Sequence, residues 1–280
     1  MQSVVNHLIQ LQELTLIRDE QKVAQGGGEY LEQLNASIAQ MAGELPREIG
    51  VMFEKLHKKN RIIITPISDG ICAACGMKLP ISQVQAVRIA KSVYNCPNCA
   101  RMLYYPESFP RHIGIKIARR SDPIKPGISR FSSQTLMIPK LESTDKDGVI
   151  RELAYKMEFE GFVDKVEKLV EAALRREAIL STAVDHGLAF PHVRGVEGGG
   201  LTLALGISRK GIKFAESAKA ITHIVFFIVI PTAASAFYLK LLSGLTQTFM
   251  NAEARRAIMA EKEPEKLWKA FLKVTRGTIK

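Results

Sequence analysis

The chain has 280 residues, enough for about two domains, and its 46% hydrophobic and 24% charged residues are an ordinary globular balance. Its four cysteines are grouped in two short motifs, which argues against a disulfide framework. The longest apolar run, residues 224–230, is far shorter than the roughly 18 residues that span a bilayer. The first residues lack the pattern of a signal peptide, so we expect a cytoplasmic protein without stable membrane insertion. The net charge of +11 is spread over both halves of the chain and favours anionic partners without singling out nucleic acid.

Residues 1–60 predict a helical hairpin, because apolar residues recur at the steps of three and four that a helix-on-helix seam requires. The first stripe begins with Val4, Leu8 and Leu11, and the second comprises Leu31, Leu34, Ile38, Met41, Leu45, Ile49, Met52 and Leu56. Gly26–Gly28 break the pattern between the stripes, and Pro46 is expected to start or kink a later helical piece. We therefore expect a coiled-coil-like hairpin, with a plain packed helix pair as the alternative.

Residues 61–106 contain all the cysteines, after a β-branched run at 61–67 that predicts a strand. Two Cys-x-x-Cys pairs, CAAC at 72–75 and CPNC at 96–99, are separated by 20 residues. Such a pair lets two thiolates converge on one ion, and a structural zinc ion takes four ligands in a tetrahedron. We predict one structural zinc ion held by Cys72, Cys75, Cys96 and Cys99, with redox dithiols as the alternative. Four thiolates leave no position for a catalytic water.

The remaining chain divides into a linker and a second domain. Residues 107–134 are basic and punctuated by prolines, which is linker composition, although GIKIA at 114–118 is a possible short strand. From 135 to 280, helical and strand patterns alternate, which indicates an α/β sandwich with a largely buried sheet. Helices are expected at 146–158, 164–176, 236–250, 252–260 and 264–273, and strands at 200–208 and 222–230.

The sequence LAFPHVRG at 188–195 sets His192 directly after a proline. A histidine that accepts a phosphoryl group must be neutral at pH 7 and needs donors for three charged oxygens. Arg176 near the end of a predicted helix and the hydroxyls of Ser181 and Thr182 are candidate donors, and Gly187 permits a close backbone approach. By its pattern alone, a lone histidine such as His192 is more often an ordinary core histidine than a phosphoryl acceptor.

Residues 135–276 carry a family resemblance in the segments REAILSTAVDHGLAFPHVRG, GIKF, ITHIVFFIVIP and FYLKLLSGL. Together they resemble the fructose/mannitol-type enzyme IIA domain of the bacterial sugar phosphotransferase system, including its nitrogen-regulatory branch. The resemblance implies a mixed sheet with helices on both faces. It also implies that His192 is the phosphorylated histidine, that Arg176 lies in the phosphate pocket, and that Tyr238 stands where the family has a second histidine. His186 is the second candidate acceptor and is expected to be a pocket-wall or turn residue.

Residues 1–106 resemble bacterial C4-type zinc-ribbon proteins with an N-terminal coiled-coil hairpin, through ISDGICAACGMKLPISQV and YNCPNCARMLYYP. This resemblance implies a docking module. The two resemblances predict a regulatory phosphocarrier that accepts its phosphoryl group from a histidine phosphocarrier protein and docks on a further protein or nucleic acid. The alternative is a non-catalytic protein that binds nucleic acid or protein and whose second domain has lost phosphotransfer.

Overall fold

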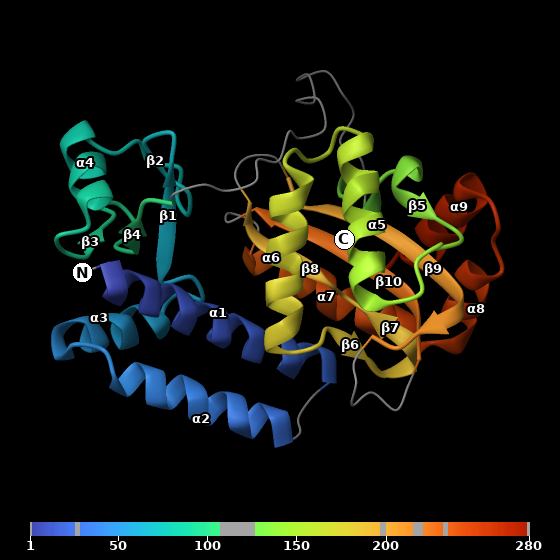
Figure 1. Ribbon diagram of the computed structural model, residues 1–280, viewed down its shortest axis with the longest axis horizontal. Coiled ribbons are helices and arrows are strands. Elements are labelled where there is room, and N and C mark those ends of the chain that lie inside the picture. The colour runs from blue at the N-terminus through green and yellow to red at the C-terminus, as the bar shows by residue number, and fades with distance from the viewer. Residues whose placement is uncertain are drawn as a thin grey trace. The chain divides into compact units, whose positions relative to one another are not determined.

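The computed structural model describes residues 2–25, 29–106, 127–196, 200–214, 221–231 and 235–278. The chain divides into two compact units, Met1–Ser108 and Phe109–Lys280 (Figure 1). Most of the expected linker, 107–126, lies outside the described residues, and so does the possible strand GIKIA. Among the described residues, no helix has the length and apolar character needed to cross a membrane.

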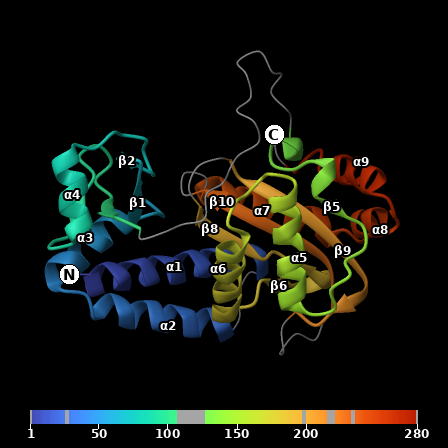
Figure 2. The same cartoon turned by 45° about the horizontal axis from the view of Figure 1, so that its top comes forward.

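Three helices open the first unit: α1 (Gln2–Gln25), α2 (Glu29–Gly43) and α3 (Arg47–His57). Helices α1 and α2 lie side by side as a hairpin (Figure 2), and the His7 Nε2 atom is 2.7 Å from the Met41 carbonyl oxygen. The predicted seam is present, since Ile38 and Met41 of α2 pack against a buried cluster that includes Leu8 of α1. Helix α3 begins directly after Pro46, as expected. The coiled-coil character of the hairpin stays a prediction.

The zinc-ribbon segment is a small sheet with one helix. Its elements are β1 (Ile64–Ser68), β2 (Ile71–Cys72), α4 (Ile81–Ile89), β3 (Tyr94–Asn95) and β4 (Met102–Tyr104), and the strand order is β2-β1-β4-β3. The Gln12 side chain of α1 accepts from the Ile63 and Ile64 amides at 2.6 and 2.9 Å. Because Ile63, Ile64 and Met102 share one buried cluster with the helices, the hairpin and the ribbon form a single folded unit.

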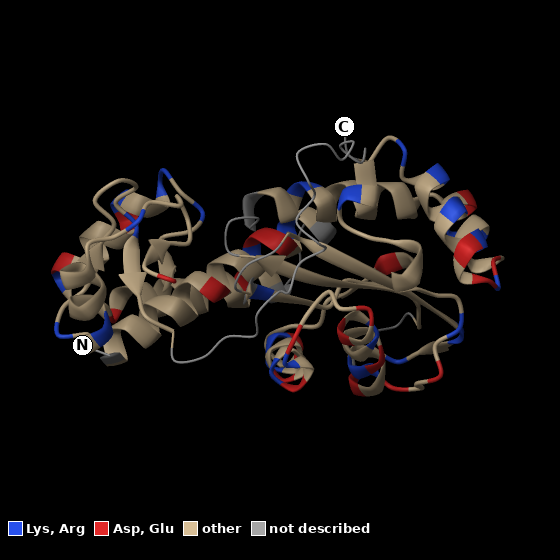
Figure 3. Ribbon diagram, turned by 90° about the horizontal axis from the view of Figure 1, so that it is seen from above, with Lys and Arg blue, Asp and Glu red and all other residues tan. Residues whose placement is uncertain are grey.

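The second unit is built on a six-stranded mixed sheet of order β5-β9-β10-β7-β6, in which β8 also pairs with β10. Strands β9 and β10 are antiparallel, and β7 and β8 run parallel to β10. Helices α5 and α6 cover one face and α7, α8 and α9 the other (Figures 1 and 3), which confirms the predicted sandwich. The strands are β5 (Met137–Ile138), β6 (Ala183–Val184), β7 (Leu188–Ala189), β8 (His192–Val196), β9 (Thr202–Ile212) and β10 (Thr222–Pro231). The helices are α5 (Lys146–Phe159), α6 (Val166–Ile179), α7 (Ser235–Met250), α8 (Ala252–Met259) and α9 (Pro264–Val274).

Strand β10 shows why the sheet forms here. Its residues 224–230 are all apolar and fully buried, which fits a central strand covered by helices on both faces. Helix α5, which precedes it in the chain, has a local start signal: the Asp145 side chain caps α5 by accepting from the Gly148 amide at 2.9 Å. The sequence pattern is therefore consistent with the fold at both the local and the tertiary level.

Residues 127–134, which the sequence analysis assigned to the linker, pack onto the sheet of the second unit. Ile128 is buried, the Ser132 hydroxyl donates to the Leu203 carbonyl at 2.7 Å, and the Leu203 amide donates to the Phe131 carbonyl at 2.7 Å. Composition concealed this packing, because only isolated apolar residues in a polar and basic stretch face the core. Linker character is therefore wrong for this end of the segment.

Candidate functional site

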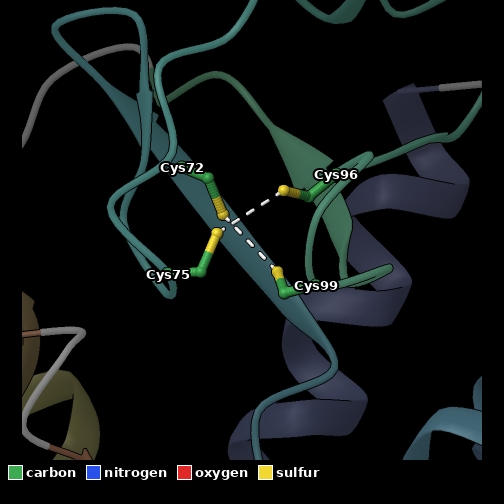
Figure 4. A group of neighbouring side chains, drawn as sticks. All are labelled: Cys72, Cys75, Cys96 and Cys99. Atoms are coloured by element: carbon green, nitrogen blue, oxygen red, sulfur yellow. Dashed lines mark hydrogen bonds between the residues drawn. The ribbon is translucent and has the colours of Figure 1, made fainter.

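The four cysteines lie on two turns of the zinc-ribbon segment that face each other (Figure 4). Their sulfur atoms all lie within 4.8 Å of one another. The Sγ atoms of Cys72 and Cys99 are 3.8 Å apart, and those of Cys75 and Cys96 are 3.6 Å apart. A tetrahedron with zinc–sulfur bonds of about 2.3 Å has sulfur–sulfur edges of about 3.8 Å. The side chains are therefore arranged as a four-coordinate zinc site requires.

The backbone around these turns stabilises the thiolate form of the cysteines, which is the form that binds a metal ion. Amides of Ala74 and Cys75 donate to the sulfur of Cys72, and amides of Cys99 and Asn98 donate to that of Cys96. Burial nevertheless raises the pKa of Cys72 to about 12 and also raises the pKa of Cys96. These thiols hold their protons unless a metal ion displaces them, so metal binding at this site releases protons.

His192 is the first residue of β8, and a two-residue gap separates β8 from β7, the other short strand that pairs in parallel with β10. Leu188 of β7 pairs with Ile224 and His192 of β8 pairs with Ile228, so both short strands follow the same edge of β10. Between them, the Pro191 carbonyl accepts a hydrogen bond from the Ile228 amide at 3.0 Å. Proline lacks an N–H, but its carbonyl still continues the ladder. The interruption at Pro191 thus places the imidazole at the start of a rigid strand.

The imidazole of His192 is buried and has a defined orientation. Its Nδ1 atom lies 2.9 Å from the Phe190 carbonyl oxygen. Because a carbonyl can only accept, we assign the proton of the neutral ring to Nδ1, which leaves the lone pair on Nε2. The Tyr238 hydroxyl lies 3.2 Å from the same Nδ1 atom, and the two ring centroids are 5.0 Å apart. The ring is therefore held from its Nδ1 side, and Nε2 is the ring nitrogen that keeps a lone pair.

Tyr238 comes from α7 and is fully buried, and it also contacts Arg194. The guanidinium carbon of Arg194 lies 4.8 Å from the centroid of the tyrosine ring. Arg194 was not among the residues predicted from the sequence. Its signal was its position two residues beyond His192 in a strand, because such residues lie on the same face. The structure thus places both His192 and Arg194 against the aromatic ring of Tyr238.

Arg176 lies in the last turn of α6 and is buried. One guanidinium nitrogen, Nη1, donates to the Leu180 carbonyl at 2.8 Å and so satisfies a carbonyl just beyond the helix end. Helix α6 packs against β8, the strand that carries His192. The predicted arginine is therefore on the helix next to the histidine strand.

Glu177 is a buried carboxylate that the sequence analysis missed. It accepts from the Thr182 hydroxyl at 2.7 Å, from the Thr182 amide at 2.9 Å and from the Ser181 hydroxyl at 2.8 Å. Burial raises the pKa of Glu177, while the hydrogen bonds from Thr182 and Ser181 oppose that shift. The hydroxyls of Ser181 and Thr182, expected from the sequence to donate to a phosphoryl group, thus donate to Glu177 instead.

The turn between β6 and β7 contains His186. This residue is exposed and has a positive φ of 68°, as a turn residue does. The following Gly187 also has a positive φ, and a Cβ atom there would lie 3.0 Å from the Ile221 carbonyl oxygen. Glycine is required at this position. His223, expected to be structural, has its Nδ1 atom 2.9 Å from the Ser208 carbonyl oxygen.

Replacing Thr182 by valine keeps the side-chain shape and removes the hydroxyl that serves Glu177. We expect the free energy of unfolding to fall by about 1.5–3 kcal/mol at neutral pH, because a hydrogen bond to a buried charged group is lost. The hydroxyl lowers the pKa of Glu177, so its contribution is present above the folded-state pKa and is lost as the pH falls through that value. Burial keeps that pKa above the usual value of a glutamate, so urea unfolding between pH 4 and pH 8 should show the loss shrinking in acid.

The matched control is Thr135→Val, since Thr135 is exposed. It is expected to change the free energy of unfolding by less than about 0.5 kcal/mol at either pH. A Thr182→Val loss that is the same in acid and at neutral pH would contradict the assignment of the hydroxyl proton to Glu177.

Comparisons with known proteins match each of the two units separately. The family model described as "Phosphoenolpyruvate-dependent sugar phosphotransferase system, EIIA 2" matches residues 130–274. The model of the C4-type zinc ribbon domain matches residues 71–103. With the sulfur geometry above, this second match establishes a C4-type zinc ribbon whose cysteines are positioned to bind one zinc ion.

Two curated relatives match part of this chain. The fructose-specific EIIABC component of Bacillus subtilis (strain 168) is 30% identical over 124 residues, which are 44% of this chain and 20% of that protein. The 2-O-alpha-mannosyl-D-glycerate-specific EIIABC component of Escherichia coli (strain K12) is 26% identical over 133 residues, which are 46% of this chain and 20% of that protein. The chain therefore spans about one fifth of the length of these relatives.

Solved structures are similar to the same part of the chain. The nitrogen regulatory protein IIA-Ntr of Neisseria meningitidis is 22% identical and has a TM-score of 0.47, covering 51% of this chain and 97% of that one. The IIA mannitol structure from Escherichia coli is 15% identical and has a TM-score of 0.43, covering 49% of this chain and 96% of that one.

Proposed function

Because this chain belongs to the family of the phosphoenolpyruvate-dependent sugar phosphotransferase system, EIIA 2, we propose that it is a phosphocarrier whose acceptor atom is Nε2 of His192. The observation that carries the proposal is the 2.9 Å contact between His192 Nδ1 and the Phe190 carbonyl oxygen. With the proton on Nδ1, the Nε2 lone pair is the nucleophile. The phosphorus–nitrogen bond to the donor's histidine breaks as the bond to Nε2 forms, and Nδ1 keeps its proton.

The residues around the ring support this chemistry. The ring gains positive charge when Nε2 binds phosphorus, and the Nδ1–H bond to the Phe190 carbonyl stabilises that charge. Thr182 has a positioning role, because its carbonyl accepts from the Phe190 amide at 3.1 Å and so holds the peptide that orients His192. Arg176 lies on the helix that packs against β8 and supplies positive charge for the phosphoryl oxygens.

The donor in this proposal is a histidine phosphocarrier protein, which carries the phosphoryl group on a histidine. The zinc-ribbon unit serves as the docking module for a downstream protein or nucleic acid, and the charge change at His192 reports the phosphorylation state. A phosphorylated histidine adds about −1.5 to −2 of charge at one point, which is enough to alter a docking surface. The role is therefore regulatory, with transfer to a sugar left to other proteins.

The direct test is transfer of label. The full chain is incubated with a histidine phosphocarrier protein that carries radioactive phosphate, and the label on each protein is followed with time. Stoichiometric labelling of this chain supports the proposal. An unlabelled chain would favour a non-catalytic binding protein that retains only the fold of the family.

Replacing Tyr238 by phenylalanine removes the hydroxyl beside His192 and keeps the aromatic ring. We expect label uptake to slow by about fivefold to tenfold, because one hydrogen bond that orients the imidazole contributes about 1 kcal/mol. Time courses with the labelled phosphocarrier protein measure the rate. Tyr155→Phe is the matched control, because Tyr155 is an exposed residue of α5. Equal rates for Tyr238→Phe and the wild type would exclude an orienting role for the hydroxyl.

A further inference from the structure

The guanidinium group of Arg194 stacks on the ring of Tyr238, close to His192 on the same strand. Resting on the phosphocarrier function proposed above, we propose that Arg194 binds the phosphoryl group on His192, and that Tyr238 is a positioning residue that holds Arg194 in place. Tyr238 contacts both partners, with its hydroxyl 3.2 Å from His192 Nδ1 and its ring centroid 4.8 Å from the guanidinium carbon of Arg194.

The position of Arg194 along β8 suits this role. Two residues further along a strand is about 6.6 Å, so Arg194 and His192 lie on the same face and within reach of one tetrahedral anion. The register is fixed, because His192 pairs with Ile228 and Arg194 with Ile230 of the fully buried strand β10. The Arg194 Nη1 atom is itself buried, where a charge is less screened than in water.

Arginine is the side chain that can both stack and bind an anion. Its planar face packs on an aromatic ring, and its N–H groups lie in the guanidinium plane, a geometry that suits phosphoryl oxygens. Tyr238 itself brings no positive charge at neutral pH. The guanidinium of Arg194, stacked on the Tyr238 ring, therefore adds the positive charge that the tyrosine side chain lacks.

The competing explanation is that Arg194 only covers the edge of a buried ring. The two explanations differ in what they predict for phosphoryl transfer, so the test measures label uptake and the lifetime of the phosphorylated protein. Arg194→Met keeps much of the apolar stem and removes the charge. We expect uptake to slow at least tenfold and the phosphohistidine lifetime to change, because one donor to a developing oxyanion is lost.

Three comparisons separate a phosphoryl-binding role from a structural one. Arg194→Lys keeps the charge without the planar fork and should recover part of the rate. Millimolar methylguanidinium should partly restore Arg194→Ala but leave the wild type unchanged. Arg151→Met, which alters an exposed arginine of α5, should take up label at the wild-type rate. The thermal midpoint of each variant is measured to show that the fold is retained.

The positioning role of Tyr238 is tested with a double-mutant cycle. In a Tyr238→Leu background the guanidinium has no ring to stack on, so Arg194→Met should cost less than about threefold there. If the wild type and Arg194→Met take up label at the same rate, the inference about Arg194 is overturned and the proposed function stands. Equal costs of Arg194→Met in both backgrounds would overturn the positioning role of Tyr238. An unlabelled wild type would instead overturn the proposed function, and this inference with it.

Discussion

Replacing His192 by alanine is expected to abolish phosphoryl uptake by this chain. The imidazole provides the Nε2 lone pair on which the phosphorus–nitrogen bond forms, and alanine provides no nucleophile. Uptake should fall by a factor of about 10⁴ or more, in line with the loss of an essential catalytic nucleophile. The measurement is label transferred from a phosphorylated histidine phosphocarrier protein. The label on the wild type should be lost in acid and kept in base, because a phosphohistidine is a phosphoramidate.

His186 provides the matched control for this experiment. It lies six residues before His192 in the chain but is exposed in the turn between β6 and β7, with a left-handed backbone. His186→Ala should therefore keep most of the label. Because His192 is buried, His192→Gln serves as a second variant with less change in volume, and its thermal midpoint shows whether the core is intact. Label that persists in His192→Ala, or disappears in His186→Ala, would contradict the assignment.

Removal of zinc is expected to unfold the zinc-ribbon segment and leave the second unit folded. Structural zinc contributes about 10–16 kcal/mol in small sites, whereas whole domains are stable by only about 5–15 kcal/mol. Apart from Ile63, Ile64 and Met102, which pack on the hairpin helices, the ribbon has only a small buried cluster around the cysteines. The second unit has its own sheet with the fully buried strand β10. Elemental analysis should find one zinc ion per chain, and limited proteolysis after chelation should cut within residues 61–106.

Two controls accompany the zinc measurement. Cys75→Ser should lose zinc yet still take up phosphoryl label, whereas His192→Ala should keep zinc and lose the label. Zinc affinity should also fall as the pH falls, because protons compete for thiolates and burial raises the pKa of Cys72 to about 12. Freshly purified, reduced protein that contains no metal and still resists proteolysis in the ribbon would contradict the prediction.

The sequence by itself predicted the parts of this protein that depend on neighbouring residues. Two Cys-x-x-Cys turns bring their thiolates together locally, so their spacing was enough to predict the zinc site. Helix α5 and strand β10 were predicted because the spacing of apolar residues follows each element's own geometry. The sequence pattern Pro191-His192 marked the candidate acceptor, and the family resemblance supplied its role, which stays a proposal here.

Only the tertiary structure decided which distant side chains meet. Tyr238 is 46 residues from His192, and the packing of α7 against the sheet alone sets the 3.2 Å contact between them. The stacking of Arg194 on that ring has the same origin. Such contacts depend on how whole elements pack, because a close-packed interior fixes side-chain positions jointly. The sequence therefore determined the acceptor candidate and the metal ligands, and the packed structure determined which groups surround the acceptor.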